Sequence, residues 1–98
     1  MQTNYWAVNL IEYERGWGSK LDEVKYFKTE DEASKWAIDY NLKYNNETTV
    51  PDWYMVAQGA DEERDFEIVT ALNNYFQKNP VAVTVTLDEL EKEKFLAR

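Results

Sequence analysis

The sequence predicts a single small α+β domain, with a small, mainly antiparallel sheet and packed helices in the order ββαβαβα. Its length of 98 residues is close to the commonest size of one domain. Four short segments are rich in aromatic and β-branched residues, which is typical of strands. Three other segments place apolar residues at helical spacing after residues that favour a helix start. No linker or low-complexity stretch divides the chain, so we expect residues 1–98 to share one core.

A β-hairpin is expected at the start of the chain. Residues 5–13 form the first strand, and the spacing puts one apolar set, Trp6, Val8 and Leu10, on a single face. Residues 15–20 interrupt the pattern with glycines that permit positive φ. Residues 23–28 resume it, with Val24 and Tyr26 on one face. We therefore expect two strands joined by a rather long loop.

The first helix is predicted to begin after Thr29. Thr29 and Glu32 have the spacing of a capping box. The residues that follow form one stripe at helical spacing: Ala33, Trp36, Ala37, Tyr40 and Tyr44. Ile38 and Leu42 lie almost opposite this stripe. We expect this pair to pack against the C-terminal helix, with a second molecule as the alternative.

The next two elements are predicted to be a short strand and a helix. Residues 53–57 are aromatic and are followed by Gly59, which closes a third strand. The acidic run 61–65 lacks the spacing of a calcium loop and is interpreted as the first turn of a helix. The apolar side of that helix would consist of Phe66, Ile68, Val69, Leu72, Tyr75 and Phe76.

The last two elements are a strand and a capped helix. Val81, Val83 and Val85 alternate with small or polar residues, which predicts a fourth strand over residues 81–86. Thr86 and Glu89 repeat the capping-box spacing. The final helix would then pack through one side, formed by Leu87, Leu90 and Phe95.

The composition argues against catalysis. Cysteine and histidine are absent, which removes thiolate nucleophiles, Cys/His metal sites and the commonest proton shuttle. Ser19 and Ser34 belong to no triad or Ser-x-x-Lys motif, and nothing marks a cleft around the carboxylates Glu12 and Glu14. No glycine-rich phosphate cradle is present. We predict a protein that is not an enzyme and that uses no cofactor or metal.

The chain is acidic, with 19 acidic and 11 basic residues and a net charge of -8. Such a field repels phosphate backbones and anionic membranes, so we expect neither direct nucleic-acid binding nor membrane binding. No basic leader or long apolar run is present, which favours a cytoplasmic location. An acidic surface does suit a basic partner, such as a site that normally holds nucleic acid.

The candidate partner-binding residues fall into three groups. Trp17 lies between glycines at the hairpin tip, near Arg15 and Lys20, and tryptophan and arginine are enriched in binding hot spots. The alternative for Trp17 is that it folds back over the sheet edge. The second group is the aromatic pair Trp53 and Tyr54. The third is an acidic helix face with Glu62, Glu63 and Asp65.

Four segments carry a resemblance to a group of natural proteins. They are Tyr5-Trp6-Ala7-Val8, the turn from Ile11 to Gly18, Glu32-Ala33, and the stretch from Val50 to Met55. Together these resemble small uncharacterised proteins encoded by tailed bacteriophages, over about the first sixty residues. The resemblance implies a phage-like origin and an infected bacterial cytoplasm. It also implies binding to a host protein, and it supplies no activity.

The leading hypothesis is a non-enzymatic protein that binds and modulates or inhibits a host macromolecule, in host takeover or anti-defence. One alternative is a nucleic-acid mimic, in which carboxylates of the protein imitate the phosphates of a nucleic acid. These carboxylates belong to Asp61, Glu62, Glu63, Asp65, Glu67, Asp88, Glu89, Glu91 and Glu93. Another is a structural or assembly protein, acting as a homodimer through Ile38 and Leu42 or an open sheet edge. A small carboxylate-dependent enzyme is the last.

Overall fold

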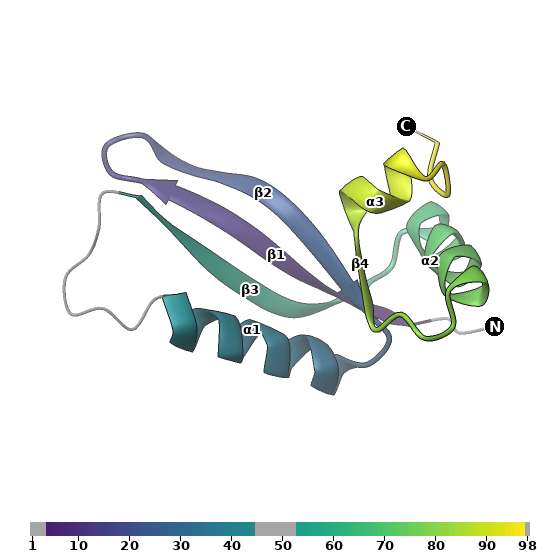
Figure 1. Cartoon of the computed structure of the whole chain (residues 1–98). Coiled ribbons are helices and arrows are strands. Elements are labelled where there is room, and N and C mark those ends of the chain that lie inside the picture. Colours follow the sequence, from purple (N-terminus) through teal and green to yellow (C-terminus); the bar gives the residue numbers. More distant parts are fainter. Residues whose placement is uncertain (1–3, 45–52, 98) are drawn as a thin grey trace.

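One antiparallel sheet and its helices make up the described part of the chain, residues 4–44 and 53–97 of a computed structural model (Figure 1). The sheet has the strand order β3-β1-β2-β4. The elements are β1 (Tyr5–Glu14), β2 (Gly18–Phe27), α1 (Glu30–Tyr44), β3 (Trp53–Glu63), α2 (Phe66–Lys78), β4 (Thr84–Thr86) and α3 (Leu87–Lys92). The predicted α+β class and the order ββαβαβα are confirmed.

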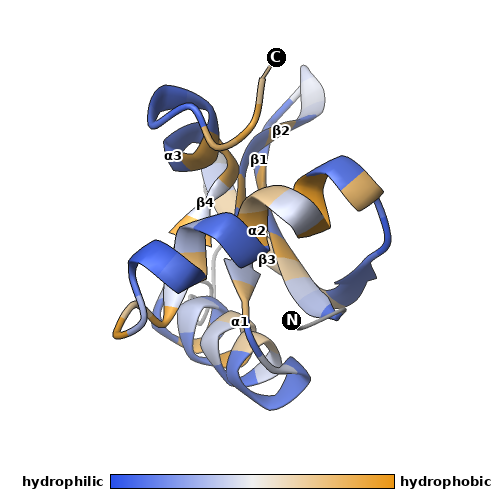
Figure 2. Ribbon diagram, turned by 90° about the vertical axis from the view of Figure 1, so that its right-hand side faces the viewer, coloured by the Kyte–Doolittle hydropathy of each residue, from blue (hydrophilic) through white to orange (hydrophobic). Residues whose placement is uncertain are grey.

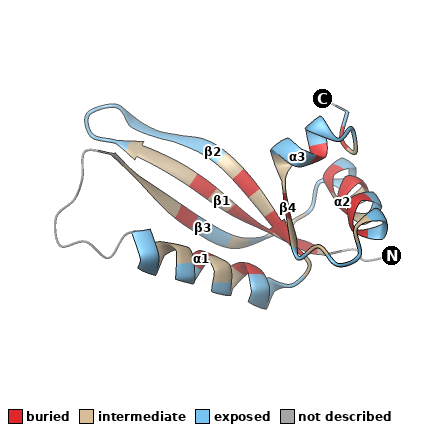
Figure 3. Ribbon diagram, viewed as in Figure 1, coloured by how far each residue is buried: buried red, intermediate tan, exposed pale blue. Residues whose placement is uncertain are grey.

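The sheet buries apolar side chains on both faces. β1 shows why, because its alternating residues send Val8 and Leu10 to one face and Tyr5 and Ala7 to the other. On the first face they pack with Phe27, Ala57 and the buried side of α1, formed by Ala33 and Ala37. On the second face the core includes Val24, Tyr26, Ile68, Ala71, Leu72, Tyr75, Phe76, Val85, Leu90 and Leu96. Figure 3 shows that the buried residues gather where helices lie on the sheet.

The β1–β2 hairpin closes more tightly than predicted. Its strands pair from Trp6 opposite Phe27 to Glu14 opposite Gly18, and the Trp17 amide donates to the Glu14 carbonyl at 3.0 Å. Gly16 and Gly18 have φ of 83° and 86°, which lets a short turn reverse the chain. The expected long loop is therefore wrong. Residues 19 and 20 belong to β2.

α1 begins as predicted but packs differently on its outer side. The Glu32 amide donates to the Thr29 hydroxyl at 3.1 Å, and that hydroxyl donates to the Glu32 carboxylate at 2.9 Å, so the Thr29–Glu32 cap is formed. Ile38 and Leu42 remain exposed. The expected packing against the C-terminal helix is wrong, because α1 and α3 lie on opposite faces of the sheet.

β3 continues well beyond its predicted end. At Gly59 the register with β1 shifts, and a Cβ there would lie 2.6 Å from the Ala7 carbonyl oxygen. Glycine thus allows the strand to pass close to β1 and to continue pairing up to Glu63, which lies opposite Tyr5. The prediction that residues 61–63 open a helix is wrong. The helix begins at Phe66, and the Asp65 carboxylate caps it by accepting from the Glu67 amide at 2.9 Å.

The last segments keep their order with shorter bounds. The apolar side of α2 is confirmed, except that Phe66 is 81% exposed at the first turn. β4 spans only Thr84–Thr86, which pair with Lys25–Phe27 of β2, and Val81 and Val83 are exposed rather than in the strand. The Thr86–Glu89 capping box is present, and Leu90 is buried as predicted, with Leu87 and Phe95 packed beside it.

Candidate functional site

Half of one sheet face carries no helix within the described residues. Ile11 lies opposite Leu21 on β2 and Val56 on β3, and Tyr13 lies opposite Ser19 and Tyr54. Cross-strand partners share a face, and β1 alternation places these residues on the same face as Ala7. We call this surface the distal face; it consists of Asn9, Ile11, Tyr13, Ser19, Leu21, Tyr54, Val56 and Gln58.

The distal face begins where α2 and α3 end. Both helices pack over the half of the sheet that contains Ala7 and Tyr26, whereas α1 follows the strands along the opposite face (Figure 1). Leu21 is 56% exposed, and the apolar side chains of Ile11 and Val56 are only half-buried. Apolar side chains thus continue from the core onto an open surface.

A tyrosine pair stands at the hairpin end of the distal face. The rings of Tyr13 and Tyr54 are stacked, with centroids 5.2 Å apart and planes 12° apart. Strand pairing sets this arrangement, since the two residues lie directly opposite each other. The Gln58 amide also donates to the Tyr13 hydroxyl at 3.4 Å. The pair is therefore held both by its backbone and by its side chains.

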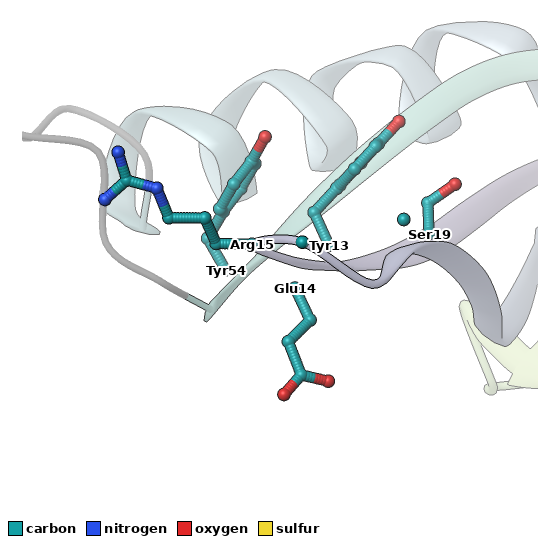
Figure 4. A pocket seen from close by; sticks show the side chains of 7 residues that line it. Tyr13, Glu14, Arg15, Ser19 and Tyr54 are labelled. Atoms are coloured by element: carbon teal, nitrogen blue, oxygen red, sulfur yellow. The ribbon is translucent and has the colours of Figure 1, made fainter.

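A shallow hollow of about 370 Å³ adjoins the tyrosine pair. Its lining residues are Tyr13, Glu14, Arg15, Gly16, Gly18, Ser19 and Tyr54. Figure 4 shows the two tyrosine rings extending side by side, with the Arg15 guanidinium near Tyr54 and the Glu14 carboxylate directed to the other side of the strand. The hollow thus combines aromatic surface with a cation.

Trp17 projects from the hairpin tip with 83% of its surface exposed. It does not fold back over the sheet edge, which was the alternative for this residue. A smaller hollow of about 190 Å³ lies beside it, lined by Glu12, Glu14, Trp17, Gly18, Ser19 and Lys20. Lys20 contacts Glu12 across the strands at 3.6 Å. The tip therefore offers contact surface on both of its sides.

The structure brings together part of the predicted set. Arg15, Trp17, Lys20 and Tyr54 all lie at the hairpin end of the sheet. The backbone of Trp53 pairs with Glu14 and therefore lies at this end too, while the Trp53 side chain is outside the described part. Sequence reasoning missed the tyrosine partner Tyr13 and the apolar row of Ile11, Leu21 and Val56. The alternating pattern assigned Ile11 to a face of the sheet, but no local pattern in the sequence shows which part of that face a helix covers.

The acidic candidates lie at the other end of the sheet and have structural roles. Glu62 accepts a hydrogen bond from Asn4 and contacts the Arg64 guanidinium at 3.0 Å. Glu63 accepts from the Asp65 amide at 3.1 Å, and Asp65 caps α2. Glu62 and Glu63 are strand residues, so the predicted acidic helix face is wrong.

The carboxylates considered for nucleic-acid mimicry fall into two groups. Residues 61–67 lie at the end of β3 and the start of α2, whereas residues 88–93 lie on α3 or directly after it. β3 is one edge of the sheet, and α3 packs on β2 and β4 at the other edge. Figure 2 shows α3 and the β3–α2 connection on opposite sides of the molecule. These acids do not form a single compact row.

The buried tyrosines belong to the core rather than to the distal face. Burial raises the pKa of Tyr5 above its ordinary value of 10.0, and its hydroxyl donates to the Asn73 side-chain oxygen at 2.7 Å. Burial likewise raises the pKa of Tyr75, with a further contribution from Glu89. In residues 4–44 and 53–97, no three acidic side chains converge as they would to hold a metal ion.

Comparisons of the chain with models of protein families, with curated proteins and with solved structures gave no match. None of the described helices is long and apolar enough to cross a membrane.

Proposed function

We propose that this chain is a non-enzymatic accessory protein of phage type that binds a host protein and modulates or inhibits it. The binding surface is the distal face together with the hairpin tip, residues 15–17. The observation that carries the proposal is the stacked pair Tyr13 and Tyr54 beside Arg15, on the half of a sheet face that no helix covers in the described part of the chain. The bacteriophage resemblance of the first sixty or so residues supplies the host.

The chemistry of the surface supports a protein partner. A few residues supply most of the binding free energy in protein interfaces; these residues are enriched in tryptophan, tyrosine and arginine and cluster near the centre of the interface. Full burial of a side chain such as Leu21 is worth about 1.5–3 kcal/mol. Here Leu21 and Trp17 are left exposed, at 56% and 83%. A partner that covers them recovers this free energy.

The rigidity of the surface also supports binding. Tyr13 and Tyr54 are held opposite each other by strand pairing, and Gly16 and Gly18 give the tip a defined short turn. Side chains that are already ordered lose less conformational entropy when a partner binds, a loss of about 0.5–1.5 kcal/mol for each flexible side chain. The distal face is therefore prepared for contact in the unbound protein.

Affinity capture from a bacterial lysate tests the proposal. The full chain is immobilised next to three variants, Trp17→Ala, Tyr54→Ser and Phe66→Ser. Phe66 is an exposed aromatic residue on α2, away from the distal face, so its variant is the matched control. We expect a host protein that is retained by the original chain and by the control, and lost from the other two. Equal retention by all four would refute binding through this surface.

A homo-oligomer is the second candidate function. The observation that favours it is the exposure of both Ile38 and Leu42 on the outer side of α1. Light scattering of the pure protein measures its mass in solution. A dimer that dissociates in the Ile38→Glu variant would support this candidate, and a monomer of 11.6 kDa at high concentration would exclude it.

A further inference from the structure

We infer that the partner element bound by the distal face is an amphipathic α-helix, apolar on one side and basic on its flanks. The inference rests on the proposed function and names the partner's chemistry. It follows from four features of the sheet: its dimensions, its continuity with the core, its protected edges and its charge.

The dimensions of the distal face match one helix. It is three strands wide, and the outer two strands of such a set lie about 10 Å apart, which is the diameter of a helix. Along β1 it runs from Asn9 to Tyr13, a rise of about 13 Å and the length of about nine helical residues. A row of apolar side chains, Leu21, Ile11 and Val56, crosses its middle. One helix of two to three turns would cover this area.

The distal face continues a layer that already contains a helix. α2 packs against Tyr5 and Ala7 of β1, and Ile11 and Tyr13 follow on the same face of the same strand. On the opposite face, α1 spans the corresponding length of the sheet (Figure 1). A partner helix would therefore occupy the vacant half of the layer formed by α2, with the same helix-on-sheet packing.

The sheet edges are poor sites for an added strand. On β3, the Asn41 side chain accepts from the Ala57 amide and donates to the Ala57 carbonyl, both at 2.9 Å, so it takes the place of a neighbouring strand. On β2, the register with β1 shifts at Asp22, and the strand carries the charged residues Lys20 and Asp22. Bulges and charged residues are the devices that protect edge strands from pairing. The open face remains as the surface for docking.

The charge of the molecule indicates which residues should lie on the flanks of the partner helix. No residue of the distal face carries a carboxylate, and the Glu14 carboxylate at its rim is directed to the other side (Figure 4). The whole chain has a net charge of -8. An apolar stripe thus suits the face itself, and basic residues on the helix flanks suit the net negative charge of the chain. The end of the helix beside the Arg15 guanidinium would be uncharged or acidic.

Two peptide libraries displayed on yeast distinguish a helix from a strand. Both contain peptides of about 14 residues with the same composition of Leu, Ile, Phe, Ala, Gln and Lys. One library places the apolar residues at i, i+3, i+4 and i+7, and the other places them at alternate positions. The full chain is the labelled probe. Leu21→Lys, an exposed strand position, is the test variant, and Phe66→Ser is the control.

We expect enrichment from the helical library only, with affinities that fall at least about tenfold for Leu21→Lys and less than about twofold for Phe66→Ser. The enriched peptides should also displace the captured host protein. Enrichment from the alternating library alone, or helical binders insensitive to Leu21→Lys, would overturn the inference. If capture of the host protein depends on Tyr54 but only peptides from the alternating library displace it, the proposed function stands and the inference of a helical partner element is refuted.

Discussion

The ring of Tyr54 on the edge strand β3 stacks on the ring of Tyr13 on the central strand β1, with 5.2 Å between centroids. This pair joins two strands at the end of the sheet that lies beyond α2 and α3, where packing against those helices does not hold the strands together. The stack therefore serves the distal face in two ways: it stabilises the strand ends and presents aromatic surface.

The contribution of the stack can be measured by a double-mutant cycle. Aromatic pairs contribute about 0.5–1.5 kcal/mol beyond their buried area. We expect Tyr13→Leu and Tyr54→Leu each to lower the free energy of unfolding, and the double variant to lose less than the sum by about that amount. Urea denaturation followed by circular dichroism gives the values. Strictly additive losses would mean that the rings do not interact.

Asn41→Ala should destabilise the protein and uncover the β3 edge. The substitution removes both partners of the Ala57 backbone, and an unsatisfied buried polar group costs about 1–3 kcal/mol. Asn74→Ala, at an exposed position of α2, controls for the helix propensity gained by alanine. Urea denaturation should show a loss only for Asn41→Ala, and light scattering should show self-association of that variant. Equal stability of the two variants would contradict this role.

Gly59→Ala is expected to be more harmful than Gly16→Ala. A Cβ at Gly59 meets the Ala7 carbonyl oxygen at 2.6 Å, so β1 and β3 must separate. At Gly16 the space is open, and the penalty is limited to a positive φ of 83°, which costs about 1–2 kcal/mol. Thermal denaturation compares the two variants, and the Tm of Gly59→Ala should be the lower. A lower Tm for Gly16→Ala would contradict the close approach at Gly59.

Alkaline pH should weaken the fold through Tyr5. Burial raises the pKa of its hydroxyl in the folded protein above the ordinary value of 10.0, so the neutral form is favoured there. The resulting stability is fully present below pH 10, the unfolded value, and is lost as the pH rises through the folded pKa. In Tyr5→Phe this part of the decline should disappear, whereas Tyr44→Phe, at an exposed position, should keep it. Denaturation at pH 9 to 11.5 checks the difference; identical slopes for all three proteins would contradict it.

Local signals in the sequence predicted much of the fold. The pairs Thr29–Glu32 and Thr86–Glu89 start helices where their spacing indicates, because a capping box is formed by residues that are neighbours in sequence. Alternation in β1 likewise assigned its two faces correctly.

The errors concern contacts between distant residues. The acidic residues 61–63 look like a first helical turn, but pairing with β1 some 55 positions earlier keeps them in a strand. Phe66 has helical spacing with the core residues of α2 and still lies outside the core. The candidate site was predicted at its tip, from Trp17 and Arg15. At its centre Tyr54 was predicted, whereas Tyr13 was missed. Tyr13 and Tyr54 meet only because β3 pairs with β1, which no local pattern reveals.

Amide hydrogen exchange of the complex with the captured host protein shows whether a partner covers the distal face. We expect binding to slow exchange in the segments containing Ile11, Tyr13 and Val56 and at the hairpin tip, and to leave exchange in α1 and α3 unchanged. Slower exchange confined to α1 around Ile38 and Leu42, or to α3, would contradict it.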